Sequence, residues 1–163
     1  MEKIQITYNG KTIEAVVNRK QLQELVGDTP KTRPNVGDTY YYIPSIGRIN
    51  CADWCDDPYD YDIWSSGNGF LTEEEAKKEL ARRQSNRRIK YFIVKNGLEF
   101  NPDWGNDMED KYFIVYSTVD DCFYSISRYT YDHGSSFYFK SKEDARLVID
   151  NCEDDLRIVF GVD

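Results

Sequence analysis

The sequence of 163 residues has only one histidine, His133, and this scarcity limits the chemistry that the chain can perform. A Ser-His-Asp or Cys-His arrangement would have to use His133, which stands in the stretch YDHGSS, a pattern typical of a solvated turn. The chain also lacks a glycine-rich phosphate loop, an HExxH motif and a GxSxG motif. Catalysis by a pair of carboxylates is not excluded, since the chain has 29 acidic residues, but a chain this acidic places carboxylates near one another by chance. We therefore predict a protein that is not an enzyme, with no catalytic residue and no cofactor.

Basic residues are fewer than acidic ones, 21 against 29, which gives a net charge of −8. A chain with this balance lacks the basic footprint of a general nucleic-acid-binding protein, so we predict no direct binding of nucleic acid. No apolar run approaches the roughly 18 residues of a membrane-spanning helix, and we expect no membrane association. The first residues, MEKIQITYNG, do not join a basic segment to an apolar one. We therefore expect no signal peptide and a cytoplasmic location.

Cysteines are few and are not arranged as metal ligands. Cys51 and Cys55 have a spacing that zinc sites use, but no second close pair follows, and the remaining cysteines, Cys122 and Cys152, stand alone. A cytoplasmic chain keeps its thiols reduced. The sequence therefore predicts no metal site and four reduced, half-buried thiols.

Aromatic residues are abundant, with 13 Tyr, 8 Phe and 3 Trp. Tyrosine suits half-buried strands, and it also suits recognition surfaces because it combines apolar area with a polar tip. Hydrophobic residues make up 40% of the chain and charged residues 31%, which indicates a globular protein. We predict an α+β fold, in which antiparallel sheets and helices are segregated.

The first 27 residues predict a small ββα unit. The segments KIQITY and TIEAVV flank Asn9-Gly10, the favoured pair of a two-residue hairpin turn. Asn18 then caps a short helix that Gly27 ends. Residues 28–38 contain two prolines and one glycine with little apolar sequence, which is typical of a linker or a surface loop.

The rest of the chain predicts two related halves, residues 39–97 and residues 111–163, joined by a connection at residues 98–110. YYI at 41–43 matches YFI at 112–114, and a cysteine follows each isoleucine by eight residues. Two helix starts also match, with Thr72 and Ser141 as the N-caps. Each half therefore predicts an antiparallel β-meander followed by a helix. The competing interpretation, two unrelated strand-to-helix transitions that share cap chemistry, remains open.

Residues 88–96, RIKYFIVKN, are ambiguous between strand and helix. Propensity favours a strand, because KYFIV recurs at 111–115 within a predicted central strand. The alternative is that the preceding helix continues to Asn96, with Gly97 as its stop.

Residues 51–64, CADWCDDPYDYDIW, predict an acidic loop, because Asp and Pro favour turns. The loop lacks the central glycine and terminal glutamate of a calcium-binding loop. One interpretation is a solvated loop, and the other is a recognition surface for a basic partner that displays negative charge as nucleic acid does. The candidate partner-binding residues are Trp54, Asp56, Asp57, Tyr59, Asp60, Tyr61 and Asp62.

A basic stretch lies between Lys77 and Lys90, where seven basic residues stand against the single acid Glu79. One interpretation is a solvated helix face whose cations favour the C-terminal end of the helix dipole. The other is an anion-binding patch, with Arg82, Arg83, Arg87 and Arg88 as its candidate residues.

Several structural motifs run through the whole chain in a recognisable order: ITYNGKTIEAVV, GDTYYYI at 37–43, GNGFLTEEEA, NPDW before DKYFIVY, FYFKSKEDA and a closing FGV. In this order the chain resembles a group of uncharacterised small proteins of bacteriophages and prophages, mainly of Firmicutes. The resemblance implies a phage origin and the cytoplasm of a bacterial host, and it implies a helix for the stretch before PDW. Because the motifs are structural, the resemblance implies no catalytic residue.

Together these observations predict a non-enzymatic phage accessory protein that binds and inhibits a host protein with a basic surface. A nucleic-acid-handling defence enzyme is the class of host protein that the acidic surface fits. Two alternatives remain open. One is a protein that binds and sequesters a small molecule or nucleotide through the basic stretch, and the other is a structural or regulatory phage component.

Overall fold

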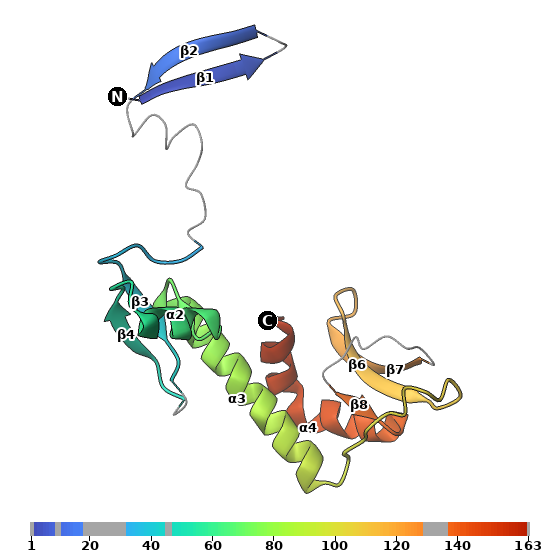
Figure 1. Ribbon diagram of the computed structural model, residues 1–163. Coiled ribbons are helices and arrows are strands. Elements are labelled where there is room, and N and C mark those ends of the chain that lie inside the picture. The colour runs from blue at the N-terminus through green and yellow to red at the C-terminus, as the bar shows by residue number, and fades with distance from the viewer. Residues whose placement is uncertain (1, 9–10, 18–31, 45–46, 129–136, 163) are drawn as a thin grey trace. The chain divides into compact units, whose positions relative to one another are not determined.

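A computed structural model describes residues 2–8, 11–17, 32–44, 47–128 and 137–162. The chain divides into two compact units. The first comprises Met1–Tyr42 and Asn50–Glu73, and the second comprises Ile43–Ile49 and Glu74–Asp163. The fold is α+β: the described residues form three helices, a two-stranded hairpin and two antiparallel three-stranded sheets (Figure 1).

The N-terminal hairpin consists of β1 (Glu2–Tyr8) and β2 (Lys11–Val17), which pair antiparallel from Glu2 opposite Val17 to Tyr8 opposite Lys11. This register fits the two-residue turn that the sequence predicts at residues 9–10. The helix expected between Asn18 and Gly27 lies outside the described residues, as does His133.

The sheet of the first unit has the order β4-β3-β5, with β3 (Thr39–Tyr42) in the centre, β4 (Asn50–Asp53) on one side and β5 (Gly69–Phe70) on the other. Its core contains Tyr40, Trp54 and Ile63. Aromatic rings meet edge to face in this core: the ring centroids of Trp54 and Tyr40 are 5.7 Å apart, and those of Trp54 and Trp64 are 5.9 Å apart.

Residues 58–65 form a helix, α2 (Pro58–Ser65), where the sequence predicted a loop. The side chain of Asp57 accepts a hydrogen bond from the Asp60 N–H at 2.9 Å, and Pro58 occupies the first helical turn. Asp and Pro are turn formers, but Asp as N-cap followed by Pro also starts a helix, so the expected loop is wrong. The indole of Trp64 then packs on Gly69 so closely that a Cβ at residue 69 would lie 2.6 Å from the ring. Only glycine fits there.

Residues 88–95 are helical, so the alternative of a continuing helix, which the resemblance also implied, is confirmed, and the strand that propensity favoured is wrong. They form the second part of α3 (Glu73–Lys95), a continuous helix that Gly97 follows with φ at +65°. The buried residues of α3 are Ala76, Ser85, Ile89 and Ile93, and the spacing of four between the last three places them on one face. Burial of this face outweighs the β propensity of the segment.

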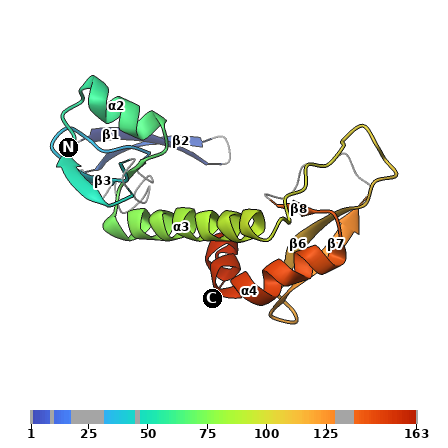
Figure 2. The ribbon, with the colours of Figure 1, turned by 90° about the horizontal axis from the view of Figure 1, so that it is seen from below.

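The sheet of the second unit has the order β7-β6-β8, with β6 (Lys111–Ser117) between β7 (Cys122–Arg128) and β8 (Tyr138–Phe139). Helix α4 (Lys142–Phe160) packs along this sheet (Figure 2). The shared core brings together side chains from both helices and the sheet: Ile89, Ile93, Ile114, Phe123, Phe137, Phe139, Ala145, Val148, Cys152 and Leu156.

Helix α4 bends at Cys152, where φ is −129° and ψ is 24° (Figure 1). Two ion pairs hold the segment after the bend. Asp155 accepts from the Arg88 guanidinium at 2.6 Å, and Arg157 lies 3.1 Å from Asp121 in the turn between β6 and β7.

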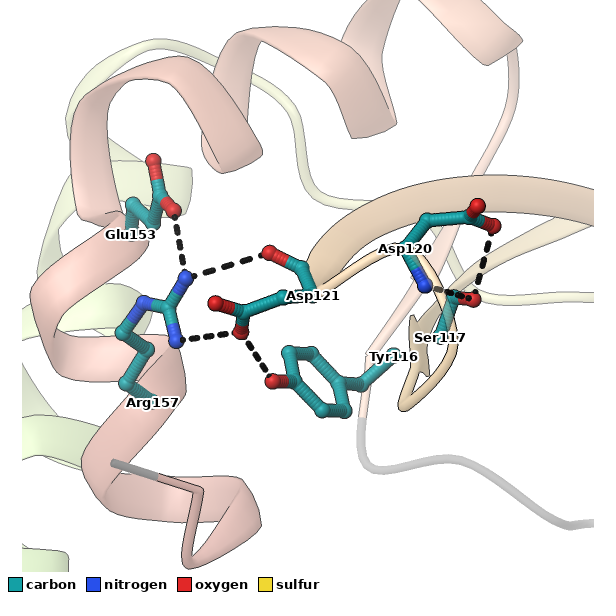
Figure 3. A network of polar contacts seen from close by, with 6 residues as sticks. All are labelled: Tyr116, Ser117, Asp120, Asp121, Glu153 and Arg157. Carbon is teal, nitrogen blue, oxygen red and sulfur yellow. Dashed lines mark hydrogen bonds and ion pairs between the residues drawn. The ribbon is translucent and has the colours of Figure 1, made fainter.

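Asp121 is the centre of a polar network that joins this turn to α4 (Figure 3). Its carboxylate accepts hydrogen bonds from the Tyr116 hydroxyl and from Arg157, and its backbone carbonyl accepts from Arg157 at 3.3 Å. The hydrogen bond from Tyr116, followed by those from Arg157, lowers the pKa of Asp121 below its usual range. The network therefore fixes the end of the β6–β7 hairpin against the helix.

The two three-stranded sheets share one topology, with the first strand central and the second and third beside it. The pairing with the third strand also corresponds, since Tyr41 lies opposite Phe70 and Tyr112 lies opposite Phe139. The cysteine correspondence is wrong: Cys51 pairs with Tyr41, whereas Cys122 pairs with Ser117. The connections differ in length, residues 43–49 against residues 118–121, so equal sequence offsets lead to different ladder positions.

Both predicted N-caps stand directly before a helix, and for Ser141 the cap bond is seen: its side chain accepts from the Asp144 N–H at 3.1 Å. We expect Ser141→Ala to lower the free energy of unfolding by about 1 kcal/mol, because it leaves that N–H without its partner. Urea denaturation followed by circular dichroism measures the change. Ser127→Ala, on the exposed side of β7, is the control, and equal midpoints for the two variants would contradict the assignment.

Candidate functional site

The position of α2 depends on a buried carboxylate, that of Asp60, which is 4% exposed. The Tyr40 hydroxyl, on β3, donates to Asp60 Oδ1 at 2.9 Å, and the Cys55 N–H donates to Oδ2 at 2.7 Å. Both oxygens are therefore satisfied, as a buried charge requires. Asp60 joins the helix to the central strand and to the chain segment that precedes the helix.

Burial and hydrogen bonding act on the Asp60 pKa in opposite directions. Burial raises it, but the hydrogen bonds from the Cys55 N–H and the Tyr40 hydroxyl outweigh burial and hold the pKa below its usual range. The pKa of Tyr40 is raised far above its usual range, first by burial and then by its hydrogen bond to Asp60. At neutral pH the pair is therefore a charged carboxylate and a neutral phenol.

Trp54 lies behind this helix and is only 1% exposed. Its indole N–H donates to Asp56 Oδ1 at 3.3 Å, and the Tyr61 hydroxyl donates to the same oxygen at 2.6 Å. The hydrogen bond from Tyr61 and then that from Trp54 lower the pKa of Asp56. Asp56 has φ at +62°, a left-handed conformation that Asp tolerates better than most residues. The carboxylate of Asp56 is thus fixed at the start of the helix.

Two tyrosines of α2 remain exposed, Tyr59 at 59% and Tyr61 at 40%. The Tyr59 ring meets Tyr42 edge to face, with centroids 6.4 Å apart, so it has a packed neighbour on one side and solvent on the other. Around the tyrosines stand exposed carboxylates. We define the α2 face as the exposed side chains of Asp56, Asp57, Tyr59, Tyr61 and Asp62.

The α2 face is smaller than the surface that the sequence predicted, because Trp54 and Asp60 are buried. Their side chains hold the helix from within and are not available for contact with a partner. An alternation of aromatic and acidic residues does not reveal which members turn inward once the segment is helical, because a helix turns about 100° per residue.

Arg33 lies at the α2 face, a contact that no pattern in the sequence indicates. Arg33 stands in the stretch predicted as a linker or surface loop, yet its guanidinium donates to the Tyr61 hydroxyl at 3.2 Å and lies 5.6 Å from the ring centroid. Asp56 accepts from the same hydroxyl. The chain itself thus illustrates how an arginine sits against a tyrosine that is paired with a carboxylate.

The basic stretch on α3 does not present four free guanidiniums. Arg82 and Arg83 both bind Glu79, each at 2.7 Å, and Arg88 binds Asp155. Arg87 is exposed, and within the described part of the chain it has no ion pair. The hydrogen bond from Arg82 lowers the pKa of Glu79 despite its partial burial, so these pairs are ionised at neutral pH. Carboxylates of the chain already occupy most of the candidate anion site.

The four cysteines are free, with Cys51, Cys55 and Cys122 exposed and Cys152 buried, so the expectation of half-buried thiols is wrong. Burial raises the pKa of the Cys152 thiol. Among the described residues, no group of three or more His, Cys, Asp or Glu side chains is arranged to hold a metal ion.

No helix in the described ranges has both the length and the apolar character that crossing a membrane requires. Comparison of the chain with protein-family models, with curated proteins and with solved structures finds no match. The candidate site therefore rests on its own geometry.

We expect Asp60→Asn to lower the free energy of unfolding by about 2 kcal/mol at pH 7, because the amide cannot accept from both buried donors. The Asp60 pKa is lower in the folded chain than in the unfolded one, so its contribution is complete above the unfolded value and is lost as the pH falls through the folded value. The difference between wild type and Asp60→Asn should therefore shrink below about pH 4.

Urea denaturation followed by tryptophan fluorescence at pH 7 and pH 3 measures this difference. Asp62→Asn, which removes an exposed charge from the same helix, is the control and should change stability little. Similar losses for the two variants would mean that the buried carboxylate does not position the helix.

Proposed function

We propose that the protein is a non-enzymatic binding protein that uses the α2 face to occupy a basic surface of another protein. The observation that carries the proposal is the division of α2 into a buried side, held by Asp60, and an exposed side with two tyrosines among carboxylates. The exposed side is polar and aromatic, and it rests on a satisfied network that needs no ligand for its stability.

The chemistry of the α2 face suits arginine and lysine side chains. Tyrosine provides large contact area and loses little conformational entropy on binding. Carboxylates beside it pair with cations and speed association through long-range attraction. The contact of Arg33 with Tyr61 supports this view, because a guanidinium from a partner can adopt the same arrangement at Tyr59.

For the partner, we propose a host protein with a basic surface, and we propose that binding inhibits it. The resemblance to phage and prophage proteins motivates the host setting. A nucleic-acid-handling defence enzyme fits the chemistry, because its basic surface binds phosphates and a rigid set of carboxylates can take their place. In this proposal the protein acts in the cytoplasm of the bacterial host.

The alternative, a protein that binds a small molecule or nucleotide through the basic stretch on α3, receives less support from the contacts of these arginines. An anion that binds Arg82, Arg83 or Arg88 has to replace Glu79 or Asp155, which already hold these guanidiniums. The third possibility, a structural or regulatory phage component, predicts no host partner and is therefore an outcome of the experiment below.

We further infer that the two three-stranded sheets are copies of one supersecondary unit. Their common strand order and the matching Tyr41–Phe70 and Tyr112–Phe139 pairs support this view. The copies differ in the helix that covers each sheet: Ile63 of α2 belongs to the first core, and α4 packs on the second sheet. In this view the insertion of α2 gave the first copy its binding face.

We expect Tyr59→Ala to weaken binding to the partner by about 2 kcal/mol, the effect of removing a central aromatic contact. The control is Tyr91→Ala, because Tyr91 is 67% exposed on α3 and lies outside the α2 face. Immobilised wild-type protein first captures the partner from a bacterial lysate, and calorimetry with the purified partner then compares the variants.

A double variant, Asp56→Asn with Asp62→Asn, tests the contribution of charge to binding. The control is a second double variant, Asp107→Asn with Asp154→Asn, which changes two exposed aspartates outside the α2 face. Both double variants lose two charges, but only the first should slow association and reduce its salt dependence. Equal affinities for Tyr59→Ala and Tyr91→Ala, or capture of no host protein, would contradict the proposed function.

A further inference from the structure

We propose that the outer edge of β7 and the groove beside it bind an extended acidic segment of a partner protein, which adds to the sheet as a strand. This surface lies within the second unit and shares no residue with the α2 face. The proposal rests on three observations: an edge strand with no second neighbouring strand among the described residues, a groove lined by that strand, and cations on the other wall of the groove.

Strand β7 lies at the edge of its sheet. It has seven residues, and within the described residues it pairs only with β6. In an antiparallel pair alternate residues direct their N–H and C=O groups away from the partner strand, so one side of β7 offers a row of backbone donors and acceptors. A chain that lies along this side in extended conformation can pair with them.

The edge of β7 lacks the features that usually protect a sheet edge. Edge strands are commonly short or carry proline or lysine. The other edges of the two three-stranded sheets are short: β4 has four residues, and β5 and β8 have two each. In contrast, β7 is long, and its sequence CFYSISR contains neither proline nor lysine. Of these edges, β7 is therefore the one suited to receive a strand.

A groove of about 380 Å³ lies beside this edge. One wall is the strand itself, with Phe123, Tyr124 and Ser125, and the other wall is α4, with Ile149 among the charged side chains. Phe123 is buried and Ile149 is half-buried, so each wall of the groove carries an apolar side chain, while successive side chains of β7 point to opposite faces of the sheet. Such a groove can receive alternate side chains of an added strand, while the backbone bonds to β7.

The charged side chains of the groove favour an acidic segment over a basic one. Lys142 and Arg146 are exposed one helical turn apart, against the single acid Asp150. Asp150 lies 4.0 Å from Arg146, and Lys142 makes no ion pair within the described ranges. Among the described residues, Lys142 therefore lacks an acidic partner and Arg146 is held only at 4.0 Å, which favours a segment with carboxylate side chains. A basic segment is disfavoured by the same charges.

The proposal is tested with two pools of eight-residue peptides, one with Glu fixed at the fourth position and the other with Lys fixed there. The remaining positions are randomised without Cys or Pro. Tyr59→Ala, which weakens the α2 face as a site for basic segments, is the parent protein in every arm, and it should enrich the Glu pool over the Lys pool by about tenfold, through charge complementarity in the groove. The double variant Lys142→Glu with Arg146→Glu should reverse this preference. Acidic residues are favourable in the first turn of a helix, so α4 should tolerate Lys142→Glu.

Lys78→Glu with Arg87→Glu, on α3, is the matched control, because it changes the net charge equally and should keep the preference of the parent protein. Hydrogen exchange then tests the mode of binding: the best acidic peptide should slow exchange of alternate amides of β7. Three outcomes would each overturn the proposal. They are equal enrichment of the two pools, a preference for the Glu pool that survives Lys142→Glu with Arg146→Glu, and binding without slower exchange in β7.

Discussion

The first unit depends on one interaction, the burial of the Asp60 carboxylate between the Tyr40 hydroxyl and the Cys55 N–H. A buried charge is tolerated only when its hydrogen bonds are complete, so this carboxylate admits one orientation of α2. Once Asp60 points inward, the helical turn directs Tyr59, Tyr61 and Asp62 outward. The same requirement that stabilises the fold therefore determines which side chains form the α2 face.

The second unit is organised differently, around an apolar core with ion pairs at its margin. Arg88 and Arg157 hold the segment of α4 that follows the bend at Cys152, and both are engaged by carboxylates of the chain. In contrast, Lys142 and Arg146 at the start of α4 remain exposed beside the edge of β7. These four cations thus divide into a pair that holds the helix and a pair that is exposed beside the groove. In our proposals, the two units offer binding surfaces of opposite charge.

Much of the fold follows from local sequence signals. Alternating hydrophobic residues identified the N-terminal strands, and cap chemistry located the start of α4 at Ser141. The sequence predictions fail where contacts between residues far apart in the chain determine the local structure. Residues 88–95 are helical because Ile89 and Ile93 join a core built by other elements, and Asp60 is buried because its acceptor oxygens meet a donor twenty residues away. The cap formed by Asp57 and Pro58 was visible in the sequence, but turn formers and helix caps use the same residues.

The central claim is that the α2 face makes the contact with the partner. A photoreactive phenylalanine analogue placed at residue 59, and separately at residue 91, tests it directly in a bacterial lysate. We predict that residue 59 crosslinks to an arginine- and lysine-rich peptide of a single host protein, and that residue 91 does not crosslink to it. Crosslinking of that protein from residue 91 but not from residue 59 would contradict the claim.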